Sequence, residues 1–288
     1  MADNNNAGCN HPDNCLQLDI RSILKDRIPP EKRRWIPSFL ISFVERLIRQ
    51  NELNEILRAT HPARGSEFSR RVLNYLNIKL EVKGLHNLKD GERYMFAGNH
   101  PLGGLDGIAL IKVLGERYGD DNIRFLVNDM LMHVLPLKEI FLPVNKFGKQ
   151  GKDYARLINE KIDSDCQIFQ FPAGLCSRLQ DNGEIKDLEW QKSFVTKALE
   201  SQRDILPVYF EGKNSKKFYK TARWRKKLGI NFNLEQILLP SELCKARNSH
   251  YRIIFGQKVS WQKLKDENKS PKEIAEQIRE LAYSLANT

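Results

Sequence analysis

The residues of this chain that point most directly to chemistry are His100 and Asp106, six positions apart in the stretch FAGNHPLGGLDGIAL. A strand-like apolar segment leads to the histidine, and an apolar run typical of a helix follows the aspartate. A carboxylate that holds the Nδ1–H of an imidazole fixes the tautomer whose Nε2 is free to act as a general base. Aspartate is also a common helix N-cap, so the pattern leaves two roles open for Asp106.

Short apolar segments alternate with amphipathic ones on both sides of this pair. Strands are predicted over 77–85, 92–100, 122–129, 166–174, 204–212 and 250–261, with a further helical piece and strand within 131–146. Helices are predicted over 67–76, 107–117, 151–164, 189–201 and 270–287, the last with a capping box of Ser270 and Glu273. Strands that alternate with helices predict an α/β protein whose mixed sheet is flanked by helices.

The predicted elements divide the chain into three parts. Residues 1–17 are polar and predict a flexible tail, residues 18–66 predict a helical segment, and residues 67–288 predict a single domain. The helix predicted over 35–57 carries an apolar face formed by Ile36, Leu40, Phe43 and Leu47. Such a face either packs on the domain or lies in a membrane interface, and the two arrangements are compatible.

The composition excludes several classes of protein. No apolar run of about 18 residues predicts a membrane-spanning helix, and the N-terminus lacks the pattern of a secretory signal. Five cysteines, an odd and scattered number, favour reduced thiols in a cytoplasm. Cys9, His11 and Cys15 lie close together, but no second pair of ligands follows at zinc-type spacing, so we expect no metal site.

The charge is strongly positive, at +11, and predicts an acidic partner. Its densest part is the segment 212–229, which holds eight Lys or Arg residues and no acid. Phe218, Thr221, Trp224 and Leu228 share one helical stripe of this segment. The pattern fits anionic lipid, an acidic carrier protein, nucleic acid or an ordinary solvated surface.

Four segments together resemble the glycerolipid acyltransferase family typified by bacterial lysophosphatidic acid acyltransferase. The first is the His–Asp stretch, preceded by Asn99 as in the family. The others are FLPVNKFG at 141–148, FPAGLCSR at 171–178 and ILPVYFEG at 205–212, all in the family's order. The resemblance covers roughly residues 75–215.

The resemblance implies transfer of an acyl chain to a hydroxyl, with His100 as general base and Asp106 as its orienting partner. The hydroxyl attacks the thioester of an acyl carrier protein or of coenzyme A directly, with no metal or other cofactor. Backbone N–H groups of the loop 101–107 or of the PAGLCS turn are candidates to bind the oxyanion. The residues assigned to substrate binding are Asn99, Gly103, Gly104, Asn145, Lys146, Phe171, Pro172, Ala173, Gly174 and Arg178.

Several positions depart from the family pattern. Five residues rather than four separate the histidine from the aspartate, and Gly103 and Gly104 are suited to absorb the extra one. Ala173 stands where the family has an acidic residue, and Cys176 where it usually has an arginine. Cys176 also raises a rival mechanism, in which His100 activates it as a nucleophile, although a small buried cysteine is usually a packing residue.

The same stretch is similar to the O-acyltransferases of bacterial aminolipid synthesis. We therefore expect a lyso-aminolipid acceptor, with 1-acylglycerol-3-phosphate acyltransferase activity as the alternative. A lipid acceptor favours binding to the inner face of a membrane from the cytoplasm, through 212–229 and the 35–57 helix. We expect no nucleic acid as partner, and a basic nucleic-acid-binding protein is the non-enzymatic alternative.

Overall fold

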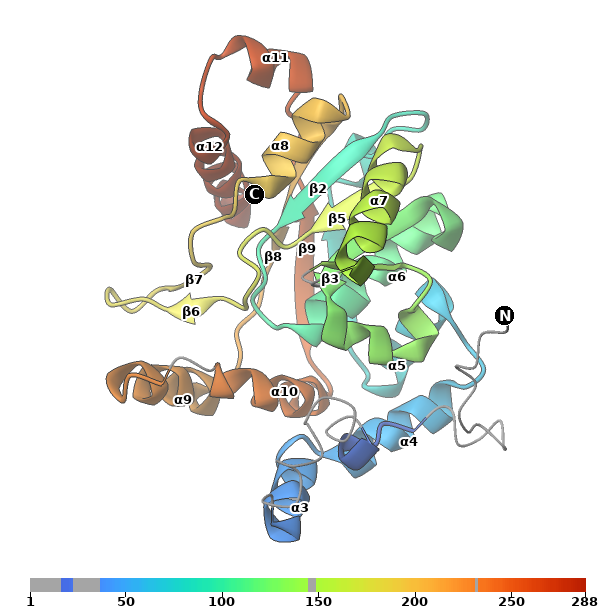
Figure 1. Ribbon diagram of the computed structural model, residues 1–288, viewed down its shortest axis with the longest axis vertical. Helices are drawn as coiled ribbons and strands as arrows, with labels where there is room; N and C mark the ends of the chain where they lie inside the picture. The colour runs from blue at the N-terminus through green and yellow to red at the C-terminus, as the bar shows by residue number, and fades with distance from the viewer. Residues whose placement is uncertain (1–16, 23–36, 145–148, 231–232) are drawn as a thin grey trace.

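A seven-stranded sheet forms the centre of the computed structural model, which describes residues 17–22, 37–144, 149–230 and 233–288 (Figure 1). The strand order is β1-β9-β8-β2-β5-β3-β4. The strands are β1 (Lys79–Lys83), β2 (Tyr94–Gly98), β3 (Ile123–Asn128), β4 (Phe141–Val144), β5 (Gln167–Gln170), β8 (Asp204–Phe210) and β9 (His250–Phe255). Neighbouring strands are parallel except β8 and β9, so the sheet is mixed, as predicted.

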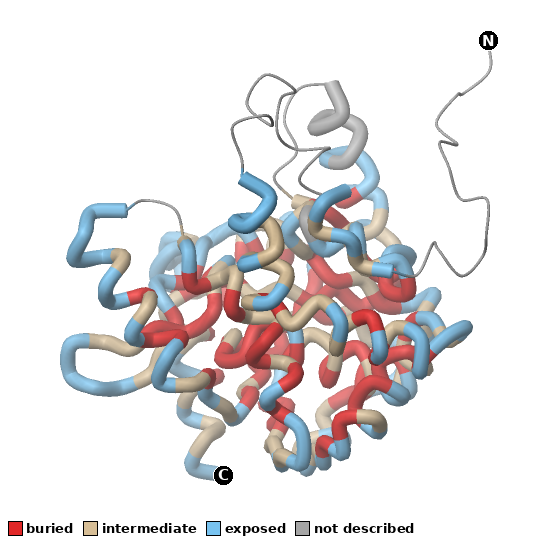
Figure 2. Tube along the Cα trace, turned by 90° about the horizontal axis from the view of Figure 1, so that it is seen from below, coloured by how far each residue is buried: buried red, intermediate tan, exposed pale blue. Residues whose placement is uncertain are grey.

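Helices cover both faces of the sheet because the central strands bury side chains on both sides. In β2, Tyr94 and Phe96 pack with one set of helices, and Met95 and Ala97 pack with the other. The first set is α5 (Gly65–Tyr75) and α6 (Gly104–Tyr118), and the second is α7 (Lys149–Asp163), α8 (Ser193–Glu200) and α12 (Pro271–Ser284). In Figure 2 the buried segments lie in the middle of the molecule, with exposed segments around them.

The carboxyl ends of the parallel strands β8, β2, β5, β3 and β4 meet at one edge of the sheet, where open α/β sheets form their sites. The predicted first and third motifs run from β2 and β5 into the loops at this edge, and the fourth consists of most of β8 and the two residues after it. Beyond the edge lie α3 (Ser38–Leu47), α9 (Lys216–Lys227) and α10 (Leu239–Lys245) (Figure 1). A short hairpin of β6 (Arg178–Leu179) and β7 (Ile185–Lys186) lies beside them.

The N-terminal helix predicted over 35–57 is two helices. It breaks after α3 because Arg49 takes a left-handed conformation with φ of 60°, and α4 (Gln50–Thr60) follows. α3 leaves Phe39 and Phe43 75% and 57% exposed, whereas Leu47 packs against the protein. Ile36 and the tail up to residue 16 lie outside the described residues.

The predicted boundary between residues 66 and 67 falls inside α5, close to its start. The division into an N-terminal segment and a main domain stays a prediction. In the part of the chain that the structure describes, no helix combines the length and the apolar character that crossing a bilayer requires.

Candidate active site

His100 lies two residues beyond the end of β2, at the carboxyl edge of the sheet. All five residues of β2 are buried, and the strand pairs with β5 and β8. The main chain of His100 is bonded on both sides: its N–H donates to Oδ1 of Asp187 at 3.2 Å, and its carbonyl accepts from Ser177 N at 2.8 Å. The backbone that carries the imidazole is therefore fixed by the two strands beside β2 and by the segments of Ser177 and Asp187.

Asp106 lies in the first turn of α6 and is completely buried. Its Oδ2 accepts from the N–H of Leu102 at 2.9 Å and of Gly103 at 3.2 Å, and its Oδ1 accepts from Gly107 N at 2.9 Å. The same Oδ1 lies 3.1 Å from Nδ1 of His100. Asp106 is not the N-cap that the sequence left open, because Gly103 holds that position. Asp106 lies three residues later, accepts from the N–H of Gly103 and also pairs with His100.

The distance between Nδ1 and Oδ1 permits an ion pair, although their alignment here is not that of a full hydrogen bond. Burial lowers the pKa of His100 most strongly, but attraction from the Asp106 carboxylate and the sulfur of Cys176 outweighs it. The net effect is a pKa well above the usual 6.5. Asp106 therefore stabilises the imidazolium that forms when His100 accepts a proton.

Phe171 covers one face of the imidazole. The two rings are stacked with their centroids 4.0 Å apart, and Phe169 of β5 meets Phe171 edge-on at 4.8 Å. The side chain of His100 nevertheless keeps 18% of its surface exposed. One aromatic ring and one carboxylate thus fix its orientation while part of it stays accessible to a substrate.

The third motif brings Cys176 against the site. Cys176 is buried with Phe218, Tyr219 and Leu238, and its sulfur contributes to the electrostatics of His100. Gly103 lies on its other side, with φ of +80°, and an added Cβ there would come within 3.1 Å of the sulfur. Position 103 therefore disfavours a side chain, and the predicted role of Gly103 and Gly104 in absorbing the extra loop residue stays a prediction.

Arg178 is already engaged within the protein. Its guanidinium donates to the carbonyl of Cys176 at 2.8 Å and to Oε1 of Glu235 at 2.8 Å. Glu235 is fully buried and also accepts from Nε of Arg225 in α9 at 2.9 Å. The role of Arg178 as a substrate ligand stays a prediction, which this geometry does not favour.

Asn99 holds two strands together. Its side-chain amide donates to the carbonyl of Phe210 at 2.9 Å and accepts from the N–H of Phe210 at 2.7 Å, which extends the pairing of β2 with β8. Both amide groups are used, so its predicted contact with substrate stays a prediction.

The other predicted substrate residues differ in their exposure. Pro172 and Ala173 are buried, whereas Gly104 and Gly174 are exposed. Asn145 and Lys146 lie outside the described residues. The structure thus brings His100, Asp106, Phe171 and Cys176 together, and the contacts proposed for the remaining residues stay predictions.

Asp187 is a buried carboxylate that the sequence did not reveal. Its Oδ1 accepts from Ser177 Oγ at 2.6 Å as well as from His100 N, and its Oδ2 accepts from Trp190 Nε1 at 2.9 Å. Burial raises the pKa of Asp187, and the hydrogen bonds from Ser177 and Trp190 and the proximity of His100 offset only part of that rise. No local motif marks this residue, because its partner His100 lies 87 positions away.

Among the residues that the structure describes, no group of three or more His, Cys, Asp or Glu side chains is placed to hold a metal ion. Cys9, His11 and Cys15 belong to the undescribed N-terminal stretch.

The fold is shared with a known acyltransferase, and the chain itself belongs to an acyltransferase family. The model of the family described as Acyltransferase matches residues 22–288, so the chain belongs to this family. The membership and the acyltransferase activity predicted from the four motifs are thereby confirmed.

Two relatives are similar over almost their whole length, and both are named lyso-glycine lipid O-acyltransferase. The protein of Bacteroides thetaiotaomicron is 40% identical over 95% of this chain and 99% of its own. That of Phocaeicola vulgatus is 41% identical over 95% of this chain and 96% of its own. The crystal structure of the 1-acyl-sn-glycerophosphate (LPA) acyltransferase PlsC from Thermotoga maritima shares the fold, with a TM-score of 0.50 and 16% identity over 86% of this chain and 88% of that one.

Asp187→Asn tests whether this carboxylate positions His100. The amide turns one acceptor into a donor, which must then face the N–H of Trp190 or the donors of His100 and Ser177. We expect kcat to fall about tenfold to hundredfold with a much smaller change in KM, because the imidazole is displaced rather than removed. Steady-state kinetics on protein of verified fold measure this split.

Glu189→Gln, which alters an exposed carboxylate two positions away, is the matched control and should retain the wild-type kcat. Trp190→Phe removes the facing donor and should restore part of the loss in the Asp187→Asn background. An Asp187→Asn enzyme with the wild-type kcat would contradict the positioning role.

The raised pKa of His100 predicts a particular pH dependence. His100 must be neutral to accept a proton, so kcat/KM should rise with pH and level off only well above pH 6.5. Asp106→Asn removes an attraction that raises this pKa, so the rise should move to lower pH while the plateau falls by up to about 10⁴. If the midpoint of the pH profile were the same in Asp106→Asn as in the wild type, the attraction between His100 and Asp106 could not be the origin of the pH dependence.

Proposed function

We propose that this acyltransferase moves a fatty acyl chain from an acyl thioester to the hydroxyl of a lyso-aminolipid of the lyso-glycine lipid type. The observation that carries the proposal is the buried carboxylate of Asp106 lying 3.1 Å from Nδ1 of a partly exposed His100. Two relatives at 40% and 41% identity, both named for this acceptor, support the choice of lipid.

The His–Asp pair supplies the proton transfers of the proposed reaction. Nε2 of His100 accepts the proton of the acceptor hydroxyl as its oxygen forms a bond to the thioester carbonyl carbon. The tetrahedral intermediate collapses by breaking the carbon–sulfur bond, and the thiolate leaves with the proton from the imidazolium. Asp106 holds Nδ1–H throughout and stabilises the positive charge on the ring. The donor is an acyl carrier protein or coenzyme A thioester.

The oxyanion requires a donor that is not already used. Asp106 occupies the N–H groups of Leu102, Gly103 and Gly107, and main-chain carbonyls occupy those of Gly174 and Ser177. We favour the N–H of Gly104, because it begins α6 and is exposed. The first N–H groups of a helix have no partner within the helix and lie at the positive end of its dipole.

The acceptor pocket is expected to differ from that of a phosphate-handling relative. Ala173 stands where the family pattern has an acidic residue. Because alanine has no polar group that needs a partner, it suits an acceptor with an amide-linked acyl chain. Since Arg178 is engaged by Glu235, the headgroup carboxylate of the acceptor needs another donor. Lys146 stays a candidate for that donor.

Membrane contact is proposed through α3 and α9, which lie at the site edge of the sheet (Figure 1). The apolar stripe predicted for 212–229 is divided: Phe218 is buried, while Trp224 and Leu228 are 68% and 63% exposed. α3 adds its exposed Phe39 and Phe43. Exposed aromatic side chains among lysines suit the headgroup region of an anionic cytoplasmic leaflet, and we expect no nucleic acid partner.

The acceptor assignment is tested by offering a lyso-glycine lipid and lysophosphatidic acid with one acyl donor in mixed micelles. We expect kcat/KM for the lyso-glycine lipid to be at least about tenfold higher, because each acceptor leaves different polar groups unpaired in the transition state. His100→Ala should abolish both activities and serves as the baseline. Equal rates, or a preference for lysophosphatidic acid, would refute the aminolipid assignment.

Direct transfer also predicts the behaviour of Cys176→Ala. Cys176 is buried against the imidazole, so its position alone does not exclude an acyl-enzyme. We expect the variant to keep most of its activity, and mass spectrometry of the wild-type enzyme with donor alone to show no acyl adduct. A stable thioester on Cys176 would replace the one-step mechanism with a two-step one.

A further inference from the structure

A cationic groove lies between α3, α9 and α10, outside the His–Asp site. Its volume is about 300 Å³, and its lining is Phe43, Arg46, Leu47, Arg49, Lys217, Ser241 and Lys245. Four of these seven side chains are cationic, and none is acidic. Such a lining favours an anion, and nothing in the proposed transfer reaction uses it.

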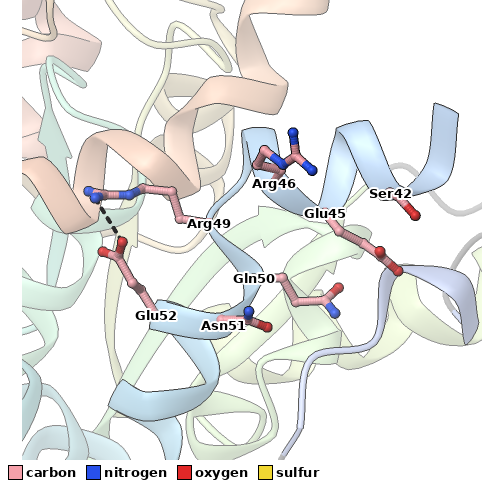
Figure 3. Close-up of a pocket in the computed structure, with 7 residues that line it drawn as sticks. All are labelled: Ser42, Glu45, Arg46, Arg49, Gln50, Asn51 and Glu52. Carbon is pink, nitrogen blue, oxygen red and sulfur yellow. Dashed lines mark ion pairs between the residues drawn. The ribbon is translucent and has the colours of Figure 1, made fainter. Parts of the chain in front are cut away.

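Two of the four cations are free to bind a ligand. Arg49 pairs with Glu52 at 2.7 Å and Lys245 pairs with Glu242 at 2.6 Å, whereas Arg46 and Lys217 are exposed and have no acidic partner among the described residues. Figure 3 shows this difference between the two arginines: a dashed line joins Arg49 to Glu52, and Arg46 carries none.

The adjoining hollow drawn in Figure 3 does not compete for the same ligand. Arg21 donates to Glu45 at 2.7 Å and to Ser42 at 3.0 Å, and Ile20 N donates to the Gln50 side chain at 3.0 Å. Ser42, Glu45 and Gln50 of that hollow are therefore engaged by the chain itself, and Arg46 lines both hollows.

The groove is also apolar along α3. Phe43 is 57% exposed at its side, and Leu47 packs against the cluster that contains Cys176. Phe39 and Leu40 of the same helix are 75% and 45% exposed. Cations beside exposed apolar side chains match a phosphate that is joined to acyl chains, rather than a free phosphate.

Two of the three helices that line the groove, α9 and α10, are fastened to each other. Glu242 of α10 accepts from Ser215 N at 2.7 Å and from Ser215 Oγ at 2.8 Å, at the start of α9. Because this carboxylate holds the two helices together, the backbone positions of Lys217 and Lys245 are fixed relative to each other. A site whose backbone is already fixed loses less conformational entropy when it binds.

We propose that this groove binds the phosphate of an anionic phospholipid, between Arg46 and Lys217, with the lipid chains leaving along Phe43. This proposal rests on the membrane contact proposed above and adds a defined headgroup site to it. The site is distinct from the acceptor site, so an anionic phospholipid is a ligand here and not a substrate.

The test uses dihexanoyl phosphatidylglycerol as a monomer below its micelle concentration, titrated into the full-length protein and followed by calorimetry. We expect saturable binding at one site, and binding of dihexanoyl phosphatidylcholine at least about tenfold weaker, because its headgroup has no net charge. Arg46→Gln combined with Lys217→Gln should weaken phosphatidylglycerol binding by at least about tenfold.

Lys226→Gln combined with Lys227→Gln is the matched control. It also removes two positive charges, but both belong to residues of α9 that do not line the groove. It should bind the monomeric lipid within about twofold of wild type, because a long-range charge effect on a soluble monomer is screened by salt. Equal weakening in both double variants, or unchanged binding in the groove variant, would overturn the proposal.

A carrier protein is the competing ligand, and the same variants identify it. If the groove variant lost affinity for acidic holo-acyl carrier protein but kept its affinity for phosphatidylglycerol, the lipid assignment would be wrong. Failure of the proposed lyso-aminolipid activity would be seen separately, as wild-type enzyme inactive in micelles, because these binding measurements use no acyl transfer.

Discussion

The site depends on the burial of one charged group: the carboxylate of Asp106 has no contact with solvent. Such a group is tolerated only when its oxygens are hydrogen-bonded and its charge is paired. Three main-chain N–H groups satisfy its oxygens and thereby shape the loop between β2 and α6. The remaining demand for a positive partner falls on His100. The carboxylate that shapes this loop is therefore the same one that raises the basicity of the imidazole.

Two further buried carboxylates connect the site to the rest of the molecule. Asp187 binds the main chain of His100 and the side chain of Ser177, and its own N–H donates to the hydroxyl of Tyr283 in α12 at 2.8 Å. Glu235 joins Arg178 to Arg225 in α9. The loop that carries Cys176 is thus held from the C-terminal helix and from the basic helix. Its position depends on both elements, although neither belongs to a motif of the site.

The sequence predicted the elements whose signals are local. β2 and β8 are short apolar runs buried on both faces, and the capping box of Ser270 and Glu273 is present at the start of α12. The proximity of His100 and Asp106 was predictable because both residues lie close together in the sequence, between the end of a buried strand and the first turn of the next helix. The mixed α/β sheet followed from the same alternation of strands and helices.

The features that the sequence did not predict depend on contacts between distant segments. Arg178 was predicted to meet substrate, but its partner Glu235 lies 57 positions away, and no periodicity links the two. Phe218 and Trp224 occupy one predicted stripe, yet packing with Tyr219 and Leu238 buries only the first. The break between α3 and α4 depends on the left-handed conformation of Arg49. This conformation is uncommon for arginine, so the residue type gives no reason to predict it.

The state of the His100 imidazole is the property that tests the central claim most directly. Long-range ¹H–¹⁵N NMR on protein labelled in its six histidines reports the tautomer and the pKa of each ring, and His100→Gln identifies the signal of His100. We expect His100 to carry its proton on Nδ1 when neutral, and to lose its second proton only well above pH 6.5. A ring protonated on Nε2, or one that titrates below pH 6.5, would contradict a general base oriented by Asp106.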